Sequence, residues 1–490
     1  MVNERSNAKR CIVWLRKDLR IDDHPAFSAA VTAGYEVLPV FLWNGSEHKW
    51  SDGEASQWWL HHALKDLAEQ LKGVGGSLLL KSYHGDTMTA LEEIISEYEI
   101  DTVFWGRRYE PEIIARDTVI KTTLTYCGVE VKSFNTHLLL EPHTVQNKSG
   151  GFYKVFTPYW KESLTRDIDP VVETDWAEAK FIDPRSEVQR SLVDLDLLPE
   201  INWDKGFYDF WEPTREEGLR RLQGMVKGKS LEYDGARDIP SEDGTSRISP
   251  WLQWGQVSAR EIYHAFDEVS NRSKKEIVEN GYLRQLFWRE FSYHLLYHVP
   301  HTAERPLRPE YERFSWRPNE QFLKAWQQGM TGFPIVDAGM RQLWQTGWMH
   351  NRVRMIVSSF LVKHLLQDWR EGASWFWDTL VDADLANNTM GWQWIAGCGA
   401  DASPYFRVFN PIIQGKKFDP DGSYVKEYLP ELADVDPKLI HEIWEVPPLE
   451  LRAAGVTLGK EYPEPIISHQ KGREQALAAY ADFKETTKNE

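Results

Sequence analysis

The sequence predicts an α/β N-terminal domain built on a doubly wound parallel sheet and an all-α C-terminal domain, joined by a long linker. Two observations carry this prediction. Short β-type runs alternate with helical patterns in the first third of the chain, and helix-length segments without strand alternation follow Thr214. A length of 490 residues is enough for two or three domains. We place the α/β domain at 1–138, the linker at 139–212 and the helical domain at 213–490.

The expected sheet has five strands, each a short and mostly apolar run. They are CIVWLR (11–16), EVLPVFLW (36–43), SLLLKSY (77–83), DTVFWG (101–106) and VEVKSF (129–134). Apolar stripes at helical spacing lie at 60–71 and 91–98, between strands, as a parallel sheet requires. The glycine fingerprint of dinucleotide-binding sheets is missing, because GVGG (73–76) precedes a strand and is interpreted as a turn.

The linker is rich in Pro, Asp and Glu, and we expect it to be irregular. The helical domain opens with TREE, which predicts a capping box between Thr214 and Glu217. Later segments such as RVRMIVSSFLVKHLLQDW have the length and pattern of helices.

Composition excludes several classes of protein. The formal charge of −17 argues against general attraction to nucleic acid or anionic membranes, but it leaves a local basic groove open. Three widely spaced cysteines predict reduced, mostly buried thiols and neither a disulfide framework nor a metal site. The N-terminus lacks a signal peptide, and no apolar run is long enough for a membrane span. We therefore expect a cytoplasmic protein.

Tryptophan is unusually frequent, with 23 residues, and DADLANNTMGWQW (382–394) places two of them beside two amides and two acids. Asp382 and Asp384 fit an acid/base pair or counter-ions for an arginine. Asn387 and Asn388 suit the edge of a heterocycle. Trp392 and Trp394 taken alone are most simply core residues, although indole rings also stack on ligands and donate electrons.

Three further stretches contain candidate binding residues. In DGTSRISPWLQWG (243–255), we expect Ser249 to cap a helix, with Pro250 in its first turn. The preceding residues Thr245, Ser246 and Arg247 fit either a phosphate cradle or an ordinary capped helix.

In GWMHNRVRMIVSSF (347–360), Asn351 and Met355 share a helical face that Arg352 and Arg354 flank. An arginine on an otherwise apolar helix needs a counter-ion, for which Asp382 and Asp384 are the candidates. In ADASPYFRVFNPIIQGKKFD (400–419), basic residues alternate with aromatic ones, which fits a nucleic-acid strand or surface charge over a packed turn. The cradle, the arginine helix and the Asp–Asn–Trp stretch together favour a buried heterocyclic cofactor.

Five motifs in order resemble the photolyase/cryptochrome flavoproteins. They are IVWLRKDLRIDDHPAF, GTSRISPWLQWGQVS, FWREFSYHLLYHVP, TGWMHNRVRM and WQWIAGCGADASPYFRVFNP, and the resemblance runs from Cys11 to Phe483. It implies an α/β antenna domain, a long linker and a helical domain that buries FAD. It also implies a second, antenna chromophore near FWGRRYEPE (104–112), for which we expect folate, with deazaflavin as the alternative.

The resemblance assigns cofactor roles to individual residues. The FAD phosphates and ribityl chain correspond to Tyr233, Thr245, Ser246 and Ser249, with Arg247 and Ile248 in the same segment. Asn388 matches the amide beside flavin N5, and Arg354 and Asp382 match a salt bridge along the flavin, with Asp384 next to it. Trp392, Trp369 and Trp316 match a relay that carries electrons from the surface to photoexcited flavin.

The substrate side resembles the branch that repairs cyclobutane pyrimidine dimers in UV-damaged DNA, in which excited reduced flavin lends an electron to a flipped-out dimer. Trp288 and Trp394 match the aromatic residues that pack against the dimer. Other lesion-side contacts correspond to Asn351, Arg352 and Met355, and groups around the DNA backbone to Arg237, Arg352 and Arg407. We expect a monomer without an obligate protein partner.

Gln285 departs from the dimer-repair pattern, which has a glutamate here. Glutamine keeps one acceptor but loses the charge, and a charged hydrogen bond contributes roughly 1.5–3 kcal/mol against about 1 for a neutral one. Glutamine also occurs in the branch that repairs (6-4) photoproducts, but that branch uses a histidine where this chain has Asn351. The alternatives are therefore (6-4) repair, a cryptochrome-type receptor without repair and, more remotely, a dark flavin oxidoreductase.

Overall fold

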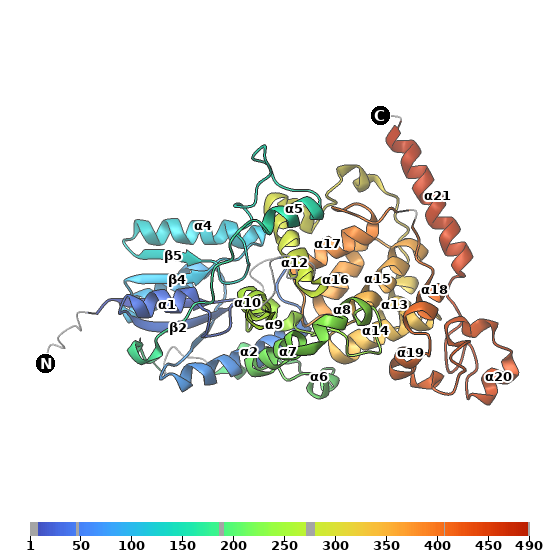
Figure 1. Ribbon diagram of the computed structural model, residues 1–490, viewed down its shortest axis with the longest axis horizontal. Helices are drawn as coiled ribbons and strands as arrows, with labels where there is room; N and C mark the ends of the chain where they lie inside the picture. Colours follow the sequence, from blue (N-terminus) through green and yellow to red (C-terminus); the bar gives the residue numbers. More distant parts are fainter. Residues whose placement is uncertain (1–7, 46–48, 186–190, 271–279, 406, 489–490) are drawn as a thin grey trace.

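A six-stranded, all-parallel sheet forms the N-terminal domain of the computed structural model, which describes residues 8–45, 49–185, 191–270, 280–405 and 407–488 (Figure 1). The strands are β1 (Arg10–Leu15), β2 (Glu36–Trp43), β3 (Leu79–Ser82), β4 (Thr102–Gly106), β5 (Glu130–Phe134) and β6 (Lys180–Phe181). In the order β3-β2-β1-β4-β5, the strands β2 and β3 are added on one side of β1, and β4 and β5 on its other side. The five predicted strands are confirmed, and β6 is an addition from the linker.

Helices cover both faces of the sheet, as the doubly wound prediction requires. They are α1 (Pro25–Thr32), α2 (Glu54–Gly73), α3 (Thr87–Tyr98) and α4 (Pro111–Tyr126). Alternate residues of β1 separate into two cores: Val13 and Leu15 pack with α1 and α2, whereas Ile12 and Trp14 pack with α3 and α4. The central strands β1, β2 and β4 are therefore buried on both faces, which explains their mostly apolar sequences, whereas the edge strand β5 is only half-buried.

The linker is more structured than its composition predicts. It contains α5 (Phe156–Ser163), the strand β6 and α6 (Lys205–Phe210), together with 3-10 turns at Trp176–Glu178 and Leu192–Leu195. β6 pairs with the first residues of β2, so the linker extends an edge of the sheet. Figure 1 shows α5 next to α12, and aromatic contacts join the two helices.

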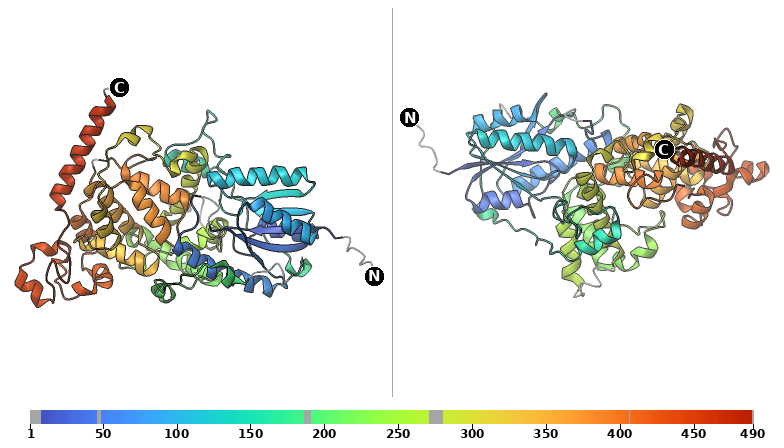
Figure 2. Two further views of the ribbon diagram at one scale, coloured as in Figure 1. Left: turned by 180° about the vertical axis from the view of Figure 1, so that it is seen from behind. Right: turned by 90° about the horizontal axis from the view of Figure 1, so that it is seen from above.

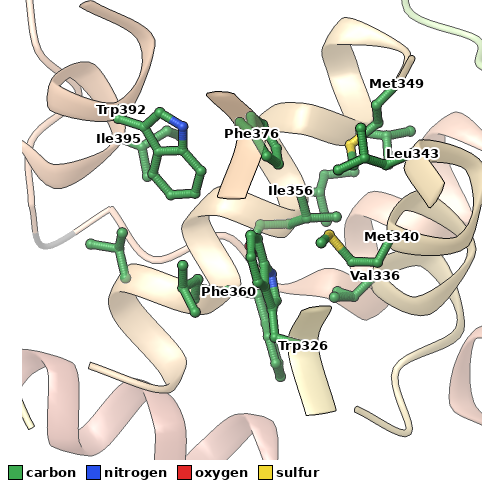
Figure 3. Packing of buried hydrophobic residues seen from close by; sticks show 14 of the residues in the cluster. Trp326, Val336, Met340, Leu343, Met349, Ile356, Phe360, Phe376, Trp392 and Ile395 are labelled. Carbon is green, nitrogen blue, oxygen red and sulfur yellow. The ribbon is translucent and has the colours of Figure 1, made fainter. Parts of the chain in front are cut away.

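The C-terminal part is helical, and none of its described residues forms a strand, which confirms the prediction. Its helices are α7 (Arg215–Gly224), α8 (Ser230–Ala236), α9 (Ser249–Gln253), α10 (Ala259–Ser270), α12 (Gly281–His298), α13 (Glu320–Gln327), α14 (Pro334–Thr346), α15 (Asn351–Ser359), α16 (Trp369–Thr379), α17 (Leu385–Ala396), α18 (Pro411–Phe418), α19 (Ser423–Tyr428), α20 (Pro448–Ala453) and α21 (His469–Lys488). Figure 2 shows α21 at the end of the molecule opposite the sheet. Trp326, Phe376 and Trp392 lie in the core of the helical part (Figure 3).

The two domains are joined by buried charges that satisfy one another. Arg20 and Asp23, from the loop after β1, are completely buried, and Arg260 of α10 lies 3.0 Å from the Asp23 carboxylate. Arg20 also donates to the carbonyl of Gly255 at 2.8 Å. Because an unpaired charge at such an interface would be strongly destabilising, this network fixes how the helical domain sits on the sheet.

Two local predictions need correction. The N-cap of α9 is Ile248, so Ser249 is already the first helical residue and its hydroxyl is free for a tertiary contact. The capping box at Thr214 is only half formed, because the Thr214 N–H donates to the Glu212 carbonyl and the Glu217 carboxylate pairs with arginines of its own helix. The prediction of mostly buried thiols agrees with the structure, in which Cys11 and Cys398 are buried and Cys127 is exposed. None of the described helices combines the length and apolar composition that a bilayer crossing requires.

Candidate functional site

An ion pair between α15 and the segment before α17 is the centre of the candidate site. Arg354 lies 3.1 and 2.9 Å from the two Asp382 carboxylate oxygens, and Ser249 donates its hydroxyl to Asp382 Oδ2 at 2.6 Å. The Asp382 side chain is 4% exposed and that of Arg354 is 24% exposed. The structure therefore selects Asp382, and not Asp384, as the partner of Arg354, and it joins the cradle segment to the arginine helix.

Asp384 has a structural role in the described contacts. It caps α17 by accepting the N–H and the side-chain amide of Asn387, both at 2.7 Å. It also accepts the hydroxyl of Tyr293 on α12, and Ser292 donates to Asn387 at 3.0 Å. The two aspartates are thus separately engaged, which does not favour the acid/base interpretation. Asp384 is best described as the residue that fixes α17 against α12.

The cradle segment between α8 and α9 is tightly folded. A Cβ on Gly244 would lie 2.6 Å from the carbonyl oxygen of Ala236, so only glycine fits this close approach. The N–H of Ile248 donates to the Ser246 hydroxyl at 3.4 Å, and Tyr282 donates to the same hydroxyl at 3.0 Å. Tyr282 in turn packs edge-on against Tyr233. The segment thus brings together the predicted residues Tyr233, Ser246 and Ile248, with Thr245 half-buried between them.

Arg247 adopts a left-handed backbone conformation, with φ of +50°, which is uncommon outside glycine. Its guanidinium lies 5.0 Å from the Phe210 ring and 5.3 Å from the Trp348 ring. The pKa of His350 is lowered to about 4. Burial is the largest cause, and the charge of Arg247 contributes in the same direction. His350 is therefore neutral at physiological pH, because burial and the charges of Arg247, Arg352 and Arg354 outweigh the opposite effect of Asp238 on its pKa.

Several buried polar atoms around this centre have no hydrogen-bond partner within the described part of the chain. They are His350 Nε2, Gln253 Oε1, Arg237 Nε and Arg352 Nε. Buried polar groups are normally satisfied, so such a group of atoms indicates room for a polar ligand. Nearby arginine donors match phosphate, and the amide and imidazole groups match a heterocycle, so these residues fit FAD. The sequence reasoning did not single out His350, Gln253 or Tyr282. The available signal was their position, because His350 and Gln253 lie inside two of the five motifs and Tyr282 lies shortly before a third.

Asn388 and the three predicted relay tryptophans lie on the adjoining helices α16 and α17 and, for Trp316, on the loop before α13. Asn388 of α17 donates to the Ala373 carbonyl of α16 at 2.9 Å. Trp392 is buried on Gly372, one turn after Trp369, and its ring centroid is 5.0 Å from that of Phe376 (Figure 3). Trp316 is half-buried, and the next residue, Arg317, donates its N–H to the Leu366 carbonyl at 2.8 Å. These contacts place Asn388 and Trp392 of α17 against α16, the helix that begins at Trp369, and they tie the residue after Trp316 to the loop before α16.

Predicted substrate-side residues gather in part at the start of α15. Arg352 pairs with Asp238 at 2.7 Å and lies 4.4 Å from the Phe418 ring, while its guanidinium also reaches the sulfur of Met355. Asn351 is exposed next to it. Because Asp238 directly follows Arg237, this ion pair joins the segments that carry two of the three predicted DNA-backbone arginines.

Other substrate-side predictions are located on different elements. Gln285 and Trp288 are half-buried on α12, and the Gln285 amide donates to the Gly281 carbonyl at 3.2 Å. Trp394 is half-buried on α17. Arg407 is exposed, and no contact within the described ranges joins it to Arg352 or Arg237. Of its predicted aromatic neighbours, Phe406 lies outside the described residues.

The expected antenna segment lies at the carboxyl ends of β1 and β4, the neighbouring strands between which the strand order switches side. Tyr293 of α12 lines the same pocket. The pocket there has room for about one water molecule. Its charged groups are already paired, since Arg108 lies 2.5 Å from Glu110 and Arg107 lies 2.7 Å from Glu141. A folate or deazaflavin does not fit this pocket as the side chains stand. Within the described chain, no group of three or more His, Cys, Asp or Glu gathers as metal ligands.

Comparisons with known proteins agree with this arrangement. Residues 11–175 match the DNA photolyase family model, and residues 282–482 match the FAD binding domain of DNA photolyase. The chain is 48% identical over 480 residues to the deoxyribodipyrimidine photo-lyase of Agrobacterium fabrum, covering 97% of this chain and 98% of that protein. It is 37% identical over 472 residues to cryptochrome-1 of Arabidopsis thaliana, covering 93% of this chain and 68% of that one. The crystal structure of a class III photolyase from Agrobacterium tumefaciens matches 99% of each chain, with a TM-score of 0.93 and 45% identity.

Proposed function

This chain belongs to the photolyase/cryptochrome family, and from that premise we propose that it is a deoxyribodipyrimidine photo-lyase, which repairs cyclobutane pyrimidine dimers in DNA with blue light. The observation that carries the proposal is the near full-length similarity to a named deoxyribodipyrimidine photo-lyase. The full-length match to a photolyase crystal structure also supports it. The fold is that of a sheet domain followed by a helical FAD-binding domain, and the function follows from the site on it.

FAD, when bound and reduced, supplies the light-excited electron that splits the cyclobutane ring of the dimer. The chain's own residues bind and orient it. Tyr233 and the 245–249 segment form the phosphate side of the site, with the positive charge of Arg247 close by. In this proposal the Arg354–Asp382 pair and the Asn388 amide would bind the polar edge of the ring system. Trp392, buried between α16 and α17, keeps water out and delivers electrons by way of Trp369 and Trp316.

The DNA side combines stacking with phosphate contacts. In this proposal Trp288 of α12 and Trp394 of α17, both in the helical domain, take the flipped-out dimer, since base stacking on an indole contributes about 1–3 kcal/mol per base. Gln285 hydrogen-bonds the exposed edge of the pyrimidines, and Asn351 and Met355 complete the lesion contacts. Arg237, Arg352 and Arg407 bind the backbone. The net charge of −17 makes this a local patch on an acidic protein.

Further features belong to the same proposal. We place the domain boundaries at residues 138 and 212, and we expect a cytoplasmic monomer without an obligate partner. A second, light-harvesting chromophore is proposed, with folate preferred to deazaflavin. Because the pocket at 106–110 is too small for either, we propose no step through this chromophore.

Gln285 gives two alternatives a specific basis, since the dimer-repair pattern has glutamate at this position. Repair of (6-4) photoproducts and receptor function without repair are separated from dimer repair by a two-lesion assay. Reduced holoprotein is illuminated with oligonucleotides that carry either a thymine dimer or a (6-4) photoproduct. We expect repair of the dimer alone, and a faster reaction for Gln285→Glu. Repair of only the (6-4) substrate, or of neither, would overturn the proposal.

A further inference from the structure

Trp288 is stacked face to face on Phe156, a residue of the linker helix α5. Their ring centroids are 3.6 Å apart and the rings are inclined by 8°. Phe156 is only 4% exposed, whereas its neighbour Val155 is 46% exposed. One face of the Trp288 indole is therefore covered by Phe156, so a base can stack only on the opposite face.

This stack is held by its surroundings. Aromatic pairs prefer offset or edge-to-face arrangements, with centroids about 4.5–7 Å apart, so the close sandwich of Phe156 and Trp288 needs external support. On α5, the Trp160 ring is parallel to Phe156, with 6.1 Å between centroids and 7° between planes. The guanidinium of Arg284, one turn before Trp288 on α12, lies 4.7 Å from the Trp160 ring. The three rings and the cation thus clamp α5 to α12.

A second support comes from the loop after α17. The Asp401 carboxylate accepts the N–H of Phe156 at 2.6 Å, at the first residue of α5. Asp401 has a φ of +47°, which is uncommon for a residue other than glycine. Two residues later, the Ser403 N–H donates to the Trp394 carbonyl at 3.2 Å. The loop therefore connects Phe156, and through it Trp288, to the backbone of Trp394.

We propose that Phe156 is a positioning residue that fixes the indole of Trp288 for stacking on the DNA lesion, and that Asp401 sets the position of Phe156. This inference rests on the proposed function, in which Trp288 and Trp394 contact the flipped-out dimer. Phe156 acts through Trp288 and has no DNA contact of its own. It follows that the linker, whose composition predicts an irregular connector, sets the lesion specificity of the helical domain.

The test measures dark binding of FAD-loaded protein to two duplexes of one sequence, with and without a thymine dimer. Phe156→Leu is expected to lower the ratio of the two affinities roughly three- to tenfold, the range that corresponds to one aromatic pair. Binding to the undamaged duplex stays the same, because phosphate contacts supply it. Phe156→Tyr retains the ring and the wild-type ratio. Val155→Ala, at the exposed neighbour, is the matched control.

A double-variant comparison separates positioning from a general effect on folding. In a Trp288→Ala background, Phe156→Leu is expected to have no further effect on the affinity ratio. Asp401→Ala keeps both rings but removes the carboxylate that holds the Phe156 N–H, so it is expected to lower the ratio in the same direction and supports the test if Phe156→Leu does not fold. A wild-type ratio for Phe156→Leu, or an added loss in the Trp288→Ala background, overturns the inference. A wild-type protein that does not discriminate between the duplexes overturns the proposed function instead.

Discussion

The six-membered ring of Trp392 lies directly on the backbone of Gly372, so closely that a Cβ at residue 372 would overlap the ring atoms Cη2, Cζ3 and Cζ2. Gly372 is in the middle of α16, where glycine weakens a helix by about 1 kcal/mol relative to alanine. The close approach of the indole explains why glycine is needed there. Trp369 and Gly372, the residue that contacts the Trp392 ring, are therefore one turn apart on α16.

Gly372→Ala is predicted to displace Trp392 and to slow photoreduction of bound flavin. Overpacking of this kind also costs about 1–3 kcal/mol of stability. The measurement is the rate of flavin bleaching under blue light with an external reductant. Gly391→Ala is the matched control, because a Cβ at exposed Gly391 meets nothing within 4 Å and alanine favours the helix. Equal bleaching rates for Gly372→Ala and wild type would remove Trp392 from the electron path.

Arg354→Met is predicted to destabilise the folded protein by about 3 kcal/mol, because it leaves the buried Asp382 carboxylate unpaired. The double variant Arg354→Met, Asp382→Asn removes both charges and is predicted to recover much of this loss. Urea unfolding of the wild type, the single variant and the double variant gives the three free energies. A double variant that is less stable than the single variant would show that the two side chains do not act as a pair.

Arg352→Ala is predicted to weaken binding to dimer-containing DNA and to lower the slope of log affinity against log salt by about one. The physical reason is the loss of one phosphate contact. Lys121→Ala, at an exposed lysine of α4 on the sheet domain, is the control and is predicted to leave the slope unchanged. Titrations at several salt concentrations measure both slopes. Equal salt slopes for the two variants would show that Arg352 does not contact a DNA phosphate.

His294 is predicted to make the protein sensitive to acid. Its Nε2 accepts the N–H of Tyr153 at 3.0 Å, so the ring is neutral, and Nδ1 donates to the Pro142 carbonyl at 3.3 Å. Burial, together with the neighbouring His298, lowers the pKa of His294 to about 4. Between pH 6.5 and pH 4 the unfolded chain binds the extra proton, so stability falls as the pH falls.

The variant His294→Gln removes this group and is predicted to lose about 2 kcal/mol less than the wild type between pH 7.5 and pH 5. Free energies of unfolding at the two pH values provide the measurement. His350 and His364, whose pKa values burial also lowers, remain in both proteins and serve as a common background. An equal fall in stability for both proteins would contradict the role of His294.

The sequence was sufficient for the sheet, the helical domain and one central contact. Apolar runs predicted the central strands because β1, β2 and β4 are buried on both faces. Arg354 was matched with an aspartate because a charge on an apolar helix requires a partner, the family resemblance pointed to Asp382, and the structure contains that ion pair. Asp384 is occupied by the cap of α17, which sequence reasoning did not foresee.

Contacts between distant parts of the chain could not be predicted. The Ser249 hydroxyl reaches Asp382 across 133 residues, and Phe156 stacks on Trp288 from a linker whose composition gave no sign of a structural role. The antenna segment was correctly expected after a strand of the sheet. Its small pocket follows from ion pairs, such as Arg107 with Glu141, that no local pattern reveals.

A repair assay in light and in the dark is the most direct test of the proposed dimer repair. Reduced, FAD-loaded protein is mixed with an oligonucleotide that contains one thymine dimer, and restored thymines are counted after blue light and after the same time in the dark. We expect the thymines to be restored in the light alone, and Trp288→Ala to repair much more slowly than wild type at subsaturating DNA. No restoration in the light by protein that is fully reduced and bound to the dimer would contradict it.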